Sequence, residues 1–238
     1  MNLKLLHLYG DLLNLYGEYA NMEILARSLR SLGHEVVIDT LSLGEDKDIS
    51  DYDLYYVGAG TEQRLKQVIP ALLKYKDALR KAMDDGKVLL FTGNACDLLG
   101  ASLTDSEGKT YPCLGFGSFE SIEGKRRITG DCVGTMEGVA GDLVGFINKC
   151  SVSKNVEQPL ISLRMGFGNE KSCGADGFRK ENCMGTHVTG PILVKNPKFL
   201  SYVLGLLLGE EAPEVKNEYA EKAYEITHRA LLARMEQK

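Results

Sequence analysis

The chain has 238 residues, enough for a single domain over residues 1–238, and its 33 acidic and 28 basic side chains give a formal net charge of −5. It contains no long basic run and no apolar stretch of membrane-spanning length, so it predicts neither nucleic-acid binding nor a membrane span. The apolar run in the opening MNLKLLHLYGD is too short for a signal peptide, which favours a cytoplasmic location.

The first half of the chain alternates strand and helix patterns. Short β-prone apolar runs predict strands over residues 3–9, 35–41, 52–60 and 87–92. Apolar residues at helical spacing predict helices over 21–34 and 62–85, with a break in the second at Pro70. Short connections between alternating elements predict a flavodoxin-like, doubly wound α/β fold with a mostly parallel sheet.

The second half has a different pattern. Short strands separated by glycine turns are expected over 117–136, 143–153, 159–169 and 185–193, as antiparallel additions to the fold. Helices are expected over 196–209 and 213–235. A stripe on the closing helix is expected to pack on the protein's own core, with partner docking as the alternative. This stripe consists of Val215, Tyr219, Ala223, Ile226 and Ala230.

The segment KVLLFTGNACDLLG, residues 87–100, reads as a strand, a sharp turn and the first turns of a helix. This is the geometry that lifts a nucleophile above a parallel sheet. The residue at the apex is Gly93, however, and the only thiol of the segment comes three positions later, at Cys96. Glycine relieves the strain of such a turn but supplies no nucleophile.

Other polar residues fall at the carboxyl ends of the predicted strands, where sites of such sheets lie. Asp11, Asn14, Tyr16 and Asn21 either shape a pocket or partner contact there, or cap a helix and close a turn. The glycines of GAGTEQ (58–63) are expected to form an ordinary turn rather than an anion site. Structural roles are expected for His7, for His34 and for the helix end at Asp84 and Asp85.

The six cysteines are scattered and include no C-x-x-C pair. Without an export signal they are expected to be free thiols. Cys173, Cys183 and His187 match no usual zinc spacing, so we predict no metal. No cofactor is predicted either.

Five separate stretches resemble one family in the same order along the chain. They are LYGDLLNLYGEYANM, YDLYYVGAG, the LLG that ends the turn segment, RRITGD and GTHVTGPILVKNP. Together they resemble the class I glutamine amidotransferases of the cobyric acid synthase (CobB/CobQ) type, and most of all the glutaminase subunits of lipid II isoglutaminyl synthases. The resemblance implies glutamine hydrolysis by a cysteine and a histidine, with ammonia passed to a Mur-ligase-like, ATP-dependent synthetase partner.

The catalytic positions depart from the family pattern. Aligning the LLG of the family elbow Cys-Gly-Gly-Tyr-Gln places its cysteine at Gly93, and aligning Gly-Pro of the late motif places its histidine at Thr189. Of a third stretch, Glu-Asn-His-Gly-Gly-Arg, only Asn148 remains, whereas Arg127 matches a family arginine associated with the glutamine site. The resemblance therefore implies a glutamine-like ligand site. Its members here are Gly60, Asn94, Arg127 and Asn148.

Two functions remain open. In the first, the chain is a catalytically inactive subunit that pairs with the synthetase. In the second, it is an active glutamine hydrolase that uses a displaced pair, Cys96 and His187, to supply ammonia for amidation of a cell-wall precursor or a cobyric-acid-like carboxylate. Cys96 lies near a helix N-terminus, which lowers a thiol pKa, and His187 shares a strand face with Thr189. The simpler interpretation is that Cys96 packs as a small apolar residue and His187 fills space.

Overall fold

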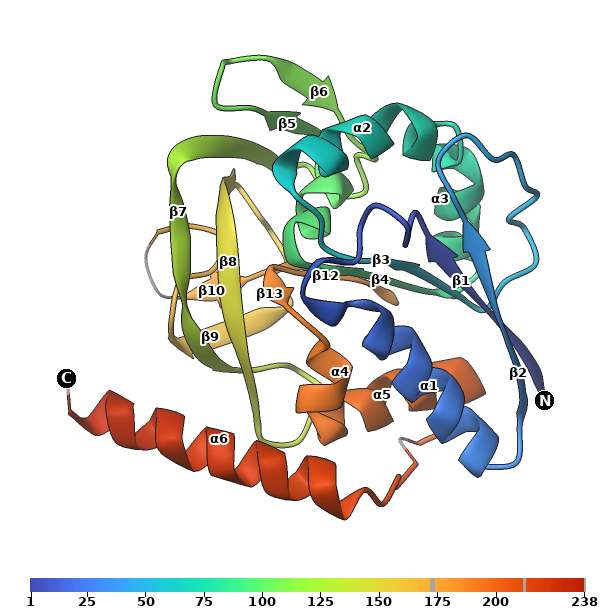
Figure 1. Cartoon of the computed structure of the whole chain (residues 1–238), viewed down its shortest axis with the longest axis vertical. Coiled ribbons are helices and arrows are strands. Elements are labelled where there is room, and N and C mark those ends of the chain that lie inside the picture. Colours follow the sequence, from blue (N-terminus) through green and yellow to red (C-terminus); the bar gives the residue numbers. More distant parts are fainter. Residues whose placement is uncertain (172–173, 212, 238) are drawn as a thin grey trace.

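A twisted central sheet organises the first half of the chain (Figure 1). The computed structural model describes residues 1–171, 174–211 and 213–237. Within them, one six-stranded sheet has the order β11-β12-β4-β3-β1-β2, and every neighbouring pair except β11–β12 is parallel. Its strands are β1 (Asn2–Leu8), β2 (Glu35–Leu41), β3 (Leu54–Val57), β4 (Val88–Thr92), β11 (Phe178–Lys180) and β12 (Cys183–Thr186).

Helices cover both faces of this sheet (Figure 1). One face packs against α2 (Glu62–Leu73) and α3 (Lys76–Asp84), and the other against α1 (Tyr19–Ser31) and α5 (Pro197–Leu208). Alternation along β1 explains the two cores, since Leu5 belongs to one apolar cluster and Leu6 to the other. The arrangement confirms the predicted flavodoxin-like, doubly wound α/β fold.

The second half adds a mainly antiparallel sheet, as predicted. Its centre is a ribbon of two long strands, β7 (Glu120–Thr135) and β8 (Asp142–Lys154), where short strands were expected. Around the ribbon lie β5 (Ser102–Thr104), β6 (Thr110–Pro112), β9 (Ile161–Met165), β10 (Ala175–Asp176) and β13 (Val188–Thr189). Shorter helical segments are η1 (Leu15–Gly17), η2 (Gly93–Leu99) and α4 (Ile192–Lys195).

Two sequence predictions about element ends were wrong. Pro70 lies inside α2 and does not break it; the helix ends at Leu73 and α3 begins at Lys76. Burial of the apolar side of α2, which includes Ile69 and Leu72, outweighs the hydrogen bond that proline removes. The predicted strand 185–193 is two strands in different sheets, because the chain crosses from β12 to β13 at His187.

The closing helix α6 (Glu218–Glu236) packs on the antiparallel sheet through a different stripe from the one expected. Tyr219 is 90% exposed and Ile226 60% exposed, so the prediction that they pack on the core was wrong. Instead Tyr224 donates a hydrogen bond to the carbonyl of Asp142, and Leu231 is buried. No helix of the described residues combines the length and apolar character that crossing a membrane requires.

Candidate functional site

The turn after β4 places Gly93 at its apex. The five residues of β4 are all buried, and the chain then enters the 3-10 helix η2 with Gly93 at φ +61°. A Cβ atom built on Gly93 would lie 2.4 Å from the Cβ of Ala59 and 3.4 Å from Cγ2 of Thr189. Real Cβ atoms do not approach a neighbour as closely as 2.4 Å, so the position accepts no side chain without movement of the β3–α2 loop.

Thr189 faces this turn and uses its hydroxyl for structure. It is 4% exposed, and its Oγ1 donates a hydrogen bond to the carbonyl of Phe146, 3.0 Å away on the paired strand β8. A threonine hydroxyl is not a base near neutral pH. The chain position opposite Gly93 therefore offers no group to accept a proton.

The loop after β3 is joined to the turn by a side-chain amide. The backbone N–H of Gly60 donates to Oδ1 of Asn94 at 3.1 Å, and Nδ2 of Asn94 donates to the carbonyl of Gly60 at 2.8 Å. In strand–turn–helix sites, oxyanion donors come from the residue after the nucleophile and from a neighbouring loop. The Gly60 donor of that loop is already occupied.

Cys96 lies inside the protein, on η2. The side chain is 1% exposed, and a Cβ on Gly185 of β12 would lie 2.9 Å from its Sγ. Burial, followed by the nearby carboxylates of Asp176 and Asp97, raises the pKa of the Cys96 thiol well above its usual value. The thiol is therefore protonated at neutral pH, the form that is a poor nucleophile.

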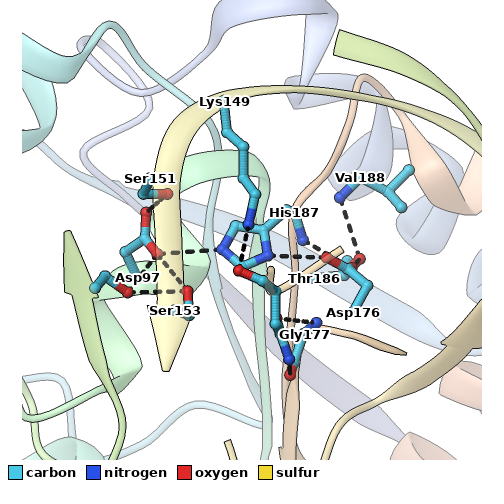
Figure 2. A network of polar contacts seen from close by, with 11 residues as sticks. Asp97, Lys149, Ser151, Ser153, Asp176, Gly177, Thr186, His187 and Val188 are labelled. Atoms are coloured by element: carbon cyan, nitrogen blue, oxygen red, sulfur yellow. Dashed lines mark hydrogen bonds and ion pairs between the residues drawn. The ribbon is translucent and has the colours of Figure 1, made fainter. Parts of the chain in front are cut away.

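His187 is held between two carboxylates (Figure 2). Its Nδ1 lies 2.9 Å from Oδ1 of Asp176, and its Nε2 lies 3.1 Å from Oδ1 of Asp97. Burial and the Lys149 ammonium act to lower the pKa of His187, but the two carboxylates outweigh them and the pKa is raised. An ionised carboxylate only accepts hydrogen bonds, so each ring nitrogen is positioned to donate to one of the two carboxylates.

The rest of this buried network satisfies the two carboxylates (Figure 2). Asp97 accepts hydrogen bonds from three serine hydroxyls, and Asp176 from the hydroxyl of Thr186 at 2.6 Å. The serines are Ser121, Ser151 and Ser153. Lys149 is fully buried beside them, its Nζ 3.4 Å from the carbonyl of Asn169, and burial lowers its pKa. The hydrogen bonds that the three serines of β7 and β8 donate to Asp97 tie η2 to the antiparallel sheet.

A third buried carboxyl group, that of Glu18, contacts the residue that precedes the turn. Glu18, fully buried, accepts hydrogen bonds from the hydroxyls of Tyr56 and Thr92, each at 2.5 Å, and from the N–H of Gly190 at 2.7 Å. Thr92 directly precedes Gly93, and Gly190 directly follows Thr189. Glu18 therefore joins the strand that leads into the turn to the segment that faces it. Burial is the main cause that raises the pKa of Glu18 to about 7.

Arg127 and Asn148 meet at the rim above α2. Nε of Arg127 donates to Oδ1 of Asn148 at 2.6 Å, and its Nη1 lies 2.9 Å from Oε1 of Glu62. Nδ2 of Asn148 donates in turn to the hydroxyl of Tyr16 at 2.7 Å. Arg127 and Glu62 line an open cleft of about 720 Å³, whose lining includes neither Gly93 nor Thr189. The arginine already has a carboxylate partner from its own chain.

The remaining sequence candidates have structural contacts. Asn14 accepts a hydrogen bond from the N–H of Tyr19, and Asn21 donates to the hydroxyl of Tyr56. The ring of His7 packs on Tyr56 with centroids 5.1 Å apart, and burial lowers the pKa of His7 to about 4. Asp11 is exposed.

Of the metal-ligand candidates, Cys173 lies outside the described residues, and Cys183 is fully buried. The described part of the chain contains no group of three or more His, Cys, Asp or Glu side chains that could hold a metal ion.

Glu18, Asp97, Lys149 and Asp176 were not singled out from the sequence. One signal for the network was present in KCSVS, because alternation places Lys149, Ser151 and Ser153 on one face of β8. Three polar residues on the inward face of a strand indicate a buried polar cluster.

Comparisons with known proteins agree with this fold. The sequence model of the CobB/CobQ-like glutamine amidotransferase domain matches residues 4–197. Two relatives, each 28% identical, carry the name lipid II isoglutaminyl synthase (glutamine-hydrolyzing) subunit GatD. The Staphylococcus aureus protein aligns over 85% of this chain and 83% of its own length, and the Streptococcus pneumoniae protein over 82% and 76%. A crystal structure of a Thermotoga maritima glutamine amidotransferase, 14% identical, has a TM-score of 0.53 and covers 98% of this chain and 97% of its own, which is a likeness of fold alone.

Proposed function

The chain belongs to the CobB/CobQ-like glutamine amidotransferase domain family, and we propose that it is a member without glutamine hydrolysis that works as a subunit of a larger complex. Hydrolysis of an amide through a thioester needs a thiolate, a base within hydrogen-bond reach and donors for the oxyanion.

The observation that carries the proposal is the lack of room for a side chain at Gly93. The apex carries no thiol, and the 2.4 Å separation between a Cβ there and the Cβ of Ala59 excludes one from the present backbone. The hydroxyl of Thr189, opposite the apex, donates a hydrogen bond to a backbone carbonyl, and the N–H of Gly60 donates to Oδ1 of Asn94. The nucleophile, the base and one oxyanion donor are each replaced by a packing or hydrogen-bonding contact.

The displaced pair, Cys96 and His187, has little support. A working pair needs the thiol within about 3 Å of a ring nitrogen that can accept its proton. Both nitrogens of His187 face carboxylates instead, and Cys96 is buried with a raised pKa. We therefore propose that Cys96 packs against β12 and that His187 holds η2 to the sheet.

The proposed complex contains a Mur-ligase-like, ATP-dependent synthetase that acts on a cell-wall precursor or a similar carboxylate. Support comes from the relatives, which are named as subunits of lipid II isoglutaminyl synthase and which this chain matches over most of their length. A chain that has the fold but does not hydrolyse glutamine can still bind the synthetase through its docking surface. A glutamine-like ligand at Arg127 and Asn148 is a further part of the proposal, and such a ligand would compete with Glu62.

The test is release of glutamate from glutamine by the purified chain, alone and co-expressed with a ligase-like gene from its own genome. We expect no release above background in either preparation, and a complex that co-purifies with an interface above about 1,000 Å². Turnover that is lost in Cys96→Ala would establish the displaced pair and overturn the proposal.

A further inference from the structure

The long ribbon contains an irregularity that the proposed function does not use. In the β7–β8 ladder, Glu123 pairs with Ser151 and Ile128 pairs with Lys149. The four residues 124–127, Gly-Lys-Arg-Arg, therefore stand opposite Cys150 alone. Such an insertion bends the strand and leaves the extra residues outside the ladder. Here it projects Lys125 and Arg126 into solvent.

A groove of about 660 Å³ lies beside this bulge. Its lining includes five cationic side chains, namely Lys125, Arg126, Arg127, Lys154 and Lys171. It also includes three aliphatic side chains, Ile122, Ile128 and Val152, and Ile122 is 41% exposed. The groove therefore combines positive charge with exposed apolar surface.

The positive charge of the groove is not neutralised by the acidic side chains that line it. Two carboxylates line it, and that of Glu123 lies 2.6 Å from Nζ of Lys66 on α2. Among the described residues, Arg127 is the one lining cation with a carboxylate within ion-pair distance, from Glu62. The excess stands out in a chain whose formal net charge is −5.

We propose that this groove binds an acidic segment of a partner protein, with apolar side chains of that segment placed on Ile122, Ile128 and Val152. The inference rests on the proposed function in taking the chain to be a subunit. Complementary charge would orient the segment, and burial of the aliphatic side chains would supply affinity. An extended segment can also bond to backbone groups of residues 124–127, which take no part in the ladder.

Two other anionic partners fit less well. Nucleic-acid-binding domains are basic overall and carry aromatic side chains for base stacking, whereas this chain is acidic and none of the described residues that line the groove is aromatic. An anionic membrane is a wide surface that would also face the acidic remainder of the chain, whereas a short acidic segment contacts the basic groove alone.

The test is a binding titration of the purified chain with a fluorescein-labelled peptide of about twelve residues that alternates glutamate and leucine. The variant Lys125→Glu/Arg126→Glu/Lys154→Glu reverses the groove charge at exposed positions. A control variant, Arg27→Glu/Lys74→Glu/Lys222→Glu, makes the same change in net charge at exposed positions elsewhere. We expect saturable binding that weakens at least about tenfold in the groove variant and is nearly unchanged in the control.

Further probes separate the contributions. Ile122→Ser and a glutamate–serine peptide should each weaken binding severalfold, and a lysine–leucine peptide should not bind. Absence of saturable binding, or equal binding by the groove variant and the wild type, would overturn the inference. So would groove-dependent binding of single-stranded DNA or phosphatidylserine vesicles that is tighter than peptide binding. Glutamate release is measured separately, so activity would end the proposed function without changing the peptide result.

Discussion

A Cβ atom on Gly93 would lie 2.4 Å from the Cβ atom of Ala59, so the apex of the turn after β4 is closed to side chains. The same glycine has φ +61°, a left-handed conformation that is costly for other residues. Two separate costs therefore fix glycine at this position, one from the backbone and one from packing.

The two costs can be measured separately. Gly93→Ala is expected to lower the free energy of unfolding by about 3 kcal/mol, from left-handed strain and overpacking together. Gly86→Ala is the matched control, because Gly86 has φ +77° and open space around its Cβ position; a loss of about 1 kcal/mol is expected there. Urea denaturation of both variants provides the comparison, and equal losses would show that Ala59 imposes no steric limit.

Removing the steric clash at position 93 is not expected to restore glutamine hydrolysis. In Gly93→Cys/Ala59→Gly the cysteine has space, but Thr189 still lacks a basic nitrogen and Asn94 still occupies the Gly60 N–H. We therefore expect no glutamate release above that of the wild type in a coupled assay. Turnover in this double variant would mean that another residue of the chain serves as base.

Glu18 is expected to make stability depend on pH. Its pKa is about 7 in the folded protein against an ordinary 4.5, so the folded state holds its proton more tightly than the unfolded state. The stabilising contribution is full below about pH 4.5 and is lost as pH rises through 7. Relative to Glu18→Gln, the wild type should lose about 2.5 kcal/mol between pH 5 and 8. A constant difference between the two proteins across this range would contradict the assignment.

The buried network should fail when one carboxylate is removed. Asp97→Asn leaves His187 and Lys149 with Asp176 as their one carboxylate, and a cost of about 3–5 kcal/mol is expected. The pKa of His187, followed by NMR, should fall in the same variant because a carboxylate that raises it is gone. Ser151→Ala, which removes one hydrogen bond to Asp97, should cost only about 1 kcal/mol. A similar small cost for both variants would show that the network carries little charge.

Local sequence patterns predicted the parts of the site that depend on neighbours in the chain. An apolar strand followed by Gly-Asn was enough to place Gly93 at a turn, because both the strand period and the glycine turn are short-range properties. The alternation of strands and helices was likewise enough for the parallel sheet.

Long-range contacts account for what the sequence did not predict. Asp97 and His187 are 90 positions apart in sequence, and they meet because the chain changes sheets at His187. Glu18 has the sequence context of an exposed helix start, where acidic residues are common. It is buried because Tyr56 and Thr92, on two other strands, converge on it. Neither the Asp97–His187 contact nor the burial of Glu18 leaves a periodic pattern or a motif within a single segment of the sequence, so local patterns could not predict them.

The ion pair between Arg127 and Glu62 is expected to weaken the binding of a glutamine-like ligand. Nη1 of Arg127 lies 2.9 Å from Oε1 of Glu62, and the carboxylate of a glutamine-like ligand would have to displace it. Removing the charge in Glu62→Gln should therefore tighten binding of L-glutamine about three- to fivefold, as expected for loss of a partly exposed pair worth up to about 1 kcal/mol. Arg127→Ala should abolish binding, and Glu23→Gln on the exposed side of α1 serves as the control. Isothermal titration calorimetry measures all four proteins; equal affinity of the wild type and Glu62→Gln would show that the ligand does not use Arg127.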